Sequence, residues 1–181
     1  FPIAPRASDA AHGSKGASPY VGEQVRAIAS LSADDVDALL NGHGWGFAKP
    51  AELNGYPGPL HVLELAGELK LTPAQKMRVE QVRQTMLQQA KVLGRAYVDS
   101  ERALSRLFAE GKASLQAISS QIAKSSELRG QLRATHLAAH VAIYPVLTSE
   151  QRTQYDVLRG YTGTAAHRAG QHEHGRGKHH H

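Results

Sequence analysis

The sequence LTPAQ at residues 71–75 recurs as LTSEQ at residues 147–151, and these two copies of L-T-x-x-Q set the start of two helices around a long hairpin. In each copy the threonine hydroxyl can accept a hydrogen bond from the backbone N–H three residues later. The glutamine at that later position can reach back to the threonine backbone, which completes a capping box. In the first copy Pro73 follows the cap, at the first helical position, where its missing N–H removes no helical hydrogen bond. Each copy therefore predicts the start of a helix.

The apolar residues between and beside the two boxes predict four helices. After the first box they recur at helical spacing until Gly111, which predicts a helix of about 36 residues, or ~54 Å. A second long series runs from Leu115 to Val146. A short amphipathic helix begins near Leu60, and another short helix follows the second box. We therefore expect an all-α protein, a four-helix antiparallel hairpin in the order short, long, long, short.

Composition divides the chain into four segments. Residues 1–19 are rich in Ala, Ser, Gly and Pro and predict a disordered lead-in. Residues 20–58 predict short helices and a loop rich in Gly and Pro. Residues 59–161 predict the helical hairpin domain, and residues 162–181 predict a disordered, histidine-rich tail. Long helices that each carry one narrow apolar stripe leave apolar surface uncovered, so we expect a homodimer.

The second segment contains one clear helix signal. Ser32 followed by Asp35 resembles a capping box before an apolar run. The glycines and prolines that follow cannot belong to one regular element. Three aromatic residues in this stretch predict a loop that is pinned onto the helical body: Trp45, Phe47 and Tyr56.

Charge and composition exclude several classes of protein. The net charge of +5 is scattered along the chain without a basic stripe, so nucleic acid is not an expected partner. Cysteine is absent, which excludes zinc fingers of the cysteine type, thiol nucleophiles and disulfides. No apolar run approaches the ~20 residues of a membrane span. No nucleophile elbow, phosphate loop or H-E-x-x-H pattern is present, so we do not expect an enzyme.

The two L-T-x-x-Q boxes, together with AELNGYPGPLHVLEL at residues 51–65, resemble the Spy/CpxP family of periplasmic proteins, which includes ZraP and CnrX. The resemblance covers roughly residues 20–161. It implies a four-helix hairpin that dimerises in the periplasm. The roles it implies are ATP-independent chaperoning, envelope-stress feedback, and metal sensing or buffering. The sequence opens at Phe1 without Met, which fits an exported chain whose signal peptide has been removed.

Two histidines on the second long helix suggest a metal site. His136 and His140 are spaced i, i+4 and so lie on one helix face, which suits a shared Zn, Cu or Ni ion. If the hairpin turns at Gly111, they face positions 86 and 82 of the first long helix. If the short helix folds back at the first box, His61 faces position 81 of the first long helix. Glu80 is the carboxylate nearest to that position. The predicted ligands are therefore His61, Glu80, His136 and His140, with Glu64 as a spare ligand or as a hydrogen-bond partner of one.

His136 and the histidines of the C-terminal tail also have simpler interpretations. His136 falls on the apolar stripe, where a hydrogen-bonded core histidine is common. In the tail, His172 and His174 can capture metal loosely, and the last three histidines can equally be the remains of a purification tag.

CnrX-like sensors draw ligands from the same regions as the predicted hairpin site, but the offsets here differ by one to three residues, and no Met stands one turn after His140.

Two functions follow from these observations. The first is a periplasmic metal-responsive protein that binds, senses or buffers a transition metal, with a membrane-bound sensor protein as a candidate partner. The alternative is an ATP-independent holdase chaperone without a specific metal role. In that case unfolded client proteins contact exposed apolar side chains and an arginine-rich rim.

Overall fold

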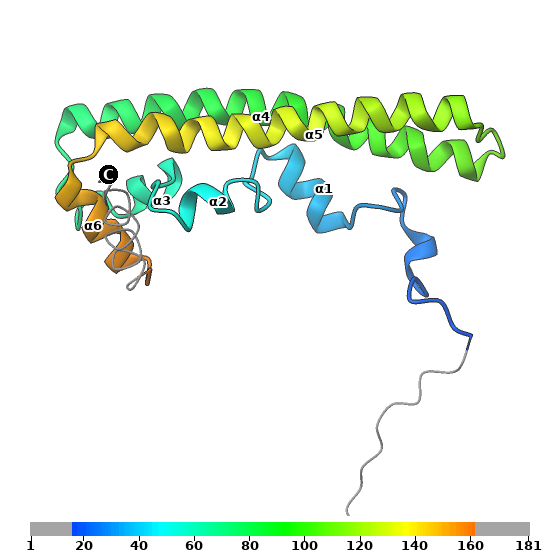
Figure 1. Ribbon diagram of the computed structural model, residues 1–181, viewed down its shortest axis with the longest axis horizontal. Coiled ribbons are helices and arrows are strands. Elements are labelled where there is room, and N and C mark those ends of the chain that lie inside the picture. Colours follow the sequence, from blue (N-terminus) through cyan, green and yellow to red (C-terminus); the bar gives the residue numbers. More distant parts are fainter. Residues whose placement is uncertain (1–15, 162–181) are drawn as a thin grey trace, which may run out of the picture.

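The computed structural model describes residues 16–161, and each regular element in that part of the chain is a helix. Two long helices form an antiparallel hairpin, and the shorter helices α1, α2 and α3 lie along one side of it (Figure 1). The elements in chain order are a 3₁₀ turn η1 (Glu23–Val25), α1 (Ala33–Leu40), α2 (Lys49–Glu52), α3 (Pro59–Glu64), α4 (Pro73–Ala109), α5 (Leu115–Ile143), a 3₁₀ turn η2 (Tyr144–Val146) and α6 (Ser149–Leu158).

The hairpin confirms the expected short-long-long-short order. Helix α4 has 37 residues, and Gly111 makes the turn with a φ of +63°, a backbone conformation that favours glycine. Helix α5 has 29 residues and ends at Ile143, where the expected single helix continues as the 3₁₀ turn η2. The reason is Pro145, which lacks an N–H and whose ring crowds the preceding helical turn.

Both L-T-x-x-Q boxes form the capping boxes that the sequence predicts. The Thr72 hydroxyl accepts from the Gln75 backbone N–H, and the Thr148 hydroxyl accepts from that of Gln151. The glutamine side chains accept in return from the two threonine backbones. The Ser32 box is also present, with Asp35 as its third residue, and begins α1.

Three short elements differ from the expectation. Of the short helices expected in residues 20–58, the stretch before α1 forms only the 3₁₀ turn η1, and the Gly/Pro-rich loop contains one helical turn, α2. Apolar residues continue at helical spacing from Leu60 to Leu69, but α3 ends at Glu64, and the chain reaches the first box through Lys70, whose φ is +50°. The sharp reversal into α4 requires this left-handed residue, which apolar spacing alone does not reveal.

The core consists of two apolar clusters on the same side of the hairpin. One joins α1 and the aromatic loop to the middle of α4 and α5, and its buried residues include Leu39, Phe47, Tyr97 and Leu132. The other joins the end of the hairpin to α3, η2 and α6, and its buried residues are Val62, Leu69, Val79, Ile143, Leu147 and Tyr155. The loop between α1 and α3 bridges the two clusters, and the candidate site lies beneath it.

Candidate functional site

His136 and His140 lie one turn apart on α5, and both are buried under the loop that connects α1 to α3. The exposed fraction is 3% for His136 and 8% for His140. Both side chains line one cavity of about 420 Å³ between this loop, α3 and the hairpin. The i, i+4 pair predicted from the sequence therefore faces a common space.

The ring of His140 is oriented by a backbone carbonyl. Its Nδ1 lies 2.8 Å from the Tyr56 carbonyl oxygen, which can only accept, so Nδ1 carries the proton and donates. In the neutral form of the ring, a proton on Nδ1 leaves the lone pair on Nε2. A carbonyl that fixes one ring nitrogen and frees the other is the arrangement common around metal-binding histidines. Nδ1 also lies 3.9 Å from Glu52 Oε2.

The ring of His136 is buried against the aromatic loop. Its Nε2 atom is buried and has no hydrogen-bond partner among residues 16–161. One face of its ring stacks on Phe47, with centroids 5.9 Å apart. Burial, and then the nearby His140, lowers the pKa of His136, so the imidazole is neutral at pH 7. A neutral imidazole with an unused nitrogen is the form that binds a metal ion.

Glu52 joins the loop to the C-terminal end of the described chain. Its Oε1 accepts from the Tyr155 hydroxyl at 2.8 Å, from Arg159 Nε at 3.2 Å and from the Tyr161 hydroxyl at 3.3 Å. Burial, and then the charge of Glu52, raises the pKa of Tyr155, so the phenol stays protonated as a donor. The other carboxylate oxygen, Oε2, is buried without a hydrogen-bond partner in the described chain and faces His140. Glu52 is not among the ligands that the sequence predicts.

His61 lines the same cavity as the histidine pair. Its side chain is 35% exposed, and its Nδ1 lies 2.8 Å from Glu64 Oε2. The expected return of α3 against the hairpin is therefore present, and Glu64 contacts His61 as a hydrogen-bond partner. His43, from the glycine-rich part of the loop, is exposed at the mouth of the cavity.

Glu80 is not brought to the histidines. Its side chain is exposed and lines a separate shallow depression with Met77, Gln84 and other α4 residues. His172 and His174 lie outside the described residues. Within residues 16–161 no three or more His, Asp or Glu side chains lie close enough together to hold a metal ion. The four-ligand site therefore stays a prediction, and the part of it that the fold assembles is the His136/His140 pair.

Comparisons with known proteins identify the family of this hairpin. No helix within residues 16–161 is both long enough and apolar enough to cross a bilayer. Comparisons with curated proteins and with solved structures gave no significant match. Residues 60–159, more than half of the chain, match the family described as "LTXXQ motif family protein". Members of this family are generally non-enzymatic proteins of the periplasm. With its two capping boxes at the start of α4 and α6, this chain belongs to the LTXXQ motif family, the Spy/CpxP-like proteins.

Proposed function

We propose that this protein is a periplasmic, metal-responsive member of its family that captures one Zn, Cu or Ni ion at the His136/His140 pair. The observation that carries the proposal is the buried Nε2 of His136, which has no hydrogen-bond partner in the described chain. A buried polar atom without a partner costs about 1–3 kcal/mol, so its retention needs a reason. An ion bound between two neighbouring imidazoles supplies one.

The cavity offers two candidates for a third donor. Glu52 Oε2 is buried and lacks a hydrogen-bond partner within residues 16–161, and His61 lies in the same cavity with its Nδ1 on Glu64. Since no group of three described residues is gathered in advance, the ion binds first to the imidazole pair and draws in the third donor. Imidazole donors with one carboxylate suit Zn, Cu and Ni alike.

Binding of an ion at the His136/His140 pair would change the conformation of the loop and of α6. The three groups involved connect different elements: His140 holds the loop at Tyr56, His136 stacks on Phe47, and Glu52 holds the α6 end through Tyr155. An ion that moves Glu52 or either ring changes how the loop and α6 rest on the hairpin. A membrane-bound sensor protein would detect the metal by binding the surface altered in this way.

Calorimetric titration with Zn, Ni and Cu tests the proposal on the full-length chain. The six tail histidines are replaced by alanine to remove competing ligands: His167, His172, His174, His179, His180 and His181. We expect one ion per chain, affinity reduced about tenfold or more by His136→Gln or His140→Gln, and none left in the double variant. His12→Gln serves as the control that should leave affinity unchanged. Absence of binding, or binding that survives the double variant, would reject the proposal.

A second candidate function is the holdase, and exposed apolar side chains on both long helices favour it. The exposed residues are Met77, Val92, Phe108, Leu115, Ile122 and Val141. Such side chains suit either unfolded clients or a second copy of the chain. Suppression of client aggregation at equimolar ratio, weakened by Val92→Ser/Ile122→Ser, would support the holdase. Sedimentation of the same variant tests the homodimer, because a dimer held together by these side chains should dissociate.

A further inference from the structure

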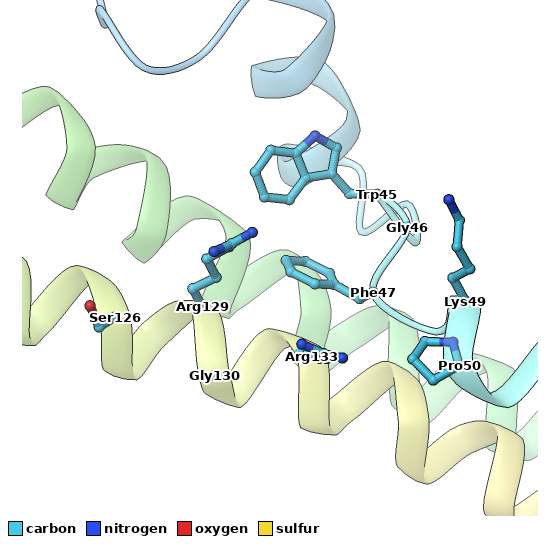
Figure 2. A pocket seen from close by; sticks show the side chains of 9 residues that line it. All are labelled: Trp45, Gly46, Phe47, Lys49, Pro50, Ser126, Arg129, Gly130 and Arg133. Atoms are coloured by element: carbon cyan, nitrogen blue, oxygen red, sulfur yellow. The ribbon is translucent and has the colours of Figure 1, made fainter.

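A second cavity, of about 550 Å³, lies between the aromatic loop and α5, and it is lined by Phe47, whose ring also stacks on His136. Figure 2 shows Trp45 and Phe47 on the loop and Arg129 reaching from α5 toward the indole. The cavity combines aromatic rings with three cationic side chains, and none of its lining residues is acidic. Its lining residues are Trp45, Gly46, Phe47, Lys49, Pro50, Ser126, Arg129, Gly130 and Arg133.

The indole of Trp45 is held in place on several sides. Its Nε1 donates to Asp35 Oδ1 at 2.8 Å, and its ring meets Phe47 edge-on with centroids 5.3 Å apart. The Arg129 guanidinium lies 5.8 Å from the indole centroid, within cation–π range. Trp45 also adopts a φ of +41°, a backbone conformation that bulky residues rarely adopt. The loop therefore presents a fixed aromatic surface beside the arginines.

The three cations are available to an anion. Lys49, Arg129 and Arg133 are exposed, and none of them forms an ion pair with a carboxylate of residues 16–161. Arg129 and Arg133 are spaced i, i+4, so they project from the same face of α5. Arginine binds carboxylates through two parallel hydrogen bonds, which makes this pair suited to acidic side chains.

We propose that this cavity binds a polypeptide segment of another protein in which acidic side chains flank an aromatic one. The carboxylates meet Arg129 and Arg133, and the aromatic ring packs on Trp45 and Phe47. The chain's own C-terminal segment does not fit, because residues 162–181 contain only one acidic side chain, against three Lys and Arg residues. Acyl chains do not fit either, because the apolar lining is limited to two rings and one proline.

The proposed peptide site is independent of the metal proposal. Trp45 and Lys49 border both cavities, but the arginines line only this one, and the histidine pair lines only the other. Variants of the two sites therefore separate the two proposals. Peptide binding should persist in His136→Gln/His140→Gln, whereas metal binding should persist in Arg129→Gln/Arg133→Gln.

Trp45 is the only tryptophan of the chain, so its fluorescence reports on this cavity. The full-length protein is titrated with a capped five-residue peptide in which two aspartates flank a phenylalanine. We expect a saturable fluorescence change that weakens with added salt, and affinity reduced about tenfold or more in Arg129→Gln/Arg133→Gln. Arg95→Gln/Arg106→Gln removes the same charge from exposed positions on α4 and should keep the affinity. Circular dichroism establishes that each variant is folded.

Two further probes define what would overturn the proposal. A peptide with asparagine in place of aspartate should not bind, and one with alanine in place of phenylalanine should bind more weakly. Equal binding of the asparagine peptide, an unchanged affinity in the Arg129/Arg133 variant, or no saturable signal would each overturn it. An equally strong response to inorganic phosphate would also overturn it, because the cavity would then recognise charge alone.

Discussion

The side-chain amides of Gln75 and Gln151 are hydrogen-bonded to each other in both directions. Gln75 Nε2 donates to Gln151 Oε1 at 2.8 Å, and Gln151 Nε2 donates to Gln75 Oε1 at 3.1 Å. Their remaining N–H groups donate to the Val146 and Leu69 carbonyls. Since each Oε1 also accepts from the threonine of its own box, all four hydrogen-bonding positions of both amides are used. The two copies of the motif thus form one joint between α4 and α6.

Replacing either glutamine should open this joint. Gln75→Ala leaves the Val146 carbonyl and half of the Gln151 amide without partners, at a cost of about 1–3 kcal/mol in the free energy of unfolding. Gln151→Ala should cost a similar amount, and the double variant less than the sum, because the two residues share their bonds. Urea unfolding measures these values, with Gln88→Ala, an exposed position on α4, as the control. Additive effects of the two substitutions would contradict a shared joint.

Gly94 should not tolerate a side chain, because a Cβ there would overlap the Leu39 carbonyl oxygen and lie 2.8 Å from its carbon. Gly94→Ala should destabilise the protein by about 1–3 kcal/mol as α1 is pushed off α4. Gly130, on α5, is the matched control, since a Cβ there meets nothing within 4 Å. Gly130→Ala should stabilise the protein by about 0.5–1 kcal/mol. Thermal or urea unfolding distinguishes the two directions, and equal effects would argue against the close approach of α1.

Acid should weaken the fold through His136. Burial, and then the charge of His140, lowers the pKa of His136 from its ordinary value of 6.5. The unfolded chain therefore takes up a proton near that pH, and the folded chain does so only at lower pH. The contribution of His136 to the free energy of unfolding is fully present above pH 6.5. It falls as the pH drops toward the lower pKa of the folded state. Urea midpoints across this range should fall more steeply for the wild type than for His136→Gln. Identical pH dependence would contradict the buried, neutral imidazole.

A methyl group at Gly58 should disturb the histidine pair. A Cβ there would lie 2.9 Å from His140 Cε1 and 3.2 Å from its Nε2, the nitrogen proposed to bind the ion. We expect Gly58→Ala to turn the His140 ring and reduce zinc affinity about tenfold. Gly67→Ala, where a Cβ meets open space, is the control. If zinc affinity is the same in both variants, the space beside His140 Nε2 is not the metal position.

The starts of three helices and the register of the hairpin were predictable because they depend on local signals. Capping boxes set the starts of α1, α4 and α6, and a turn centred on Gly111 pairs residue 121 with residue 101. In the structure Gln121 donates to the Ser100 carbonyl at 2.8 Å, within one residue of that expectation. The pinned aromatic loop is also confirmed, since Phe47 is buried and Tyr56 packs on Tyr144 with centroids 4.6 Å apart.

The surroundings of the histidines were less predictable. Glu52 lies between Gly- and Pro-rich stretches, and nothing in its sequence neighbourhood predicts that the loop carries it under Tyr155. The hairpin register predicts how far along α4 Glu80 lies, but it does not predict the direction in which the side chain points. In the structure the Glu80 side chain is exposed in a separate depression. Contacts between distant segments depend on how an irregular loop folds back, which neither periodicity nor capping encodes.

Electron paramagnetic resonance of bound copper tests the proposed metal site, because coupling to imidazole nitrogens counts the histidines that hold the ion. We use the full-length chain with its six tail histidines replaced by alanine, loaded with one Cu²⁺ per chain. We expect coupling to at least two imidazoles, reduced to fewer in His136→Gln and in His140→Gln and absent in the double variant. An unchanged nitrogen pattern in the double variant, or a spectrum of free copper in the parent chain, would contradict it.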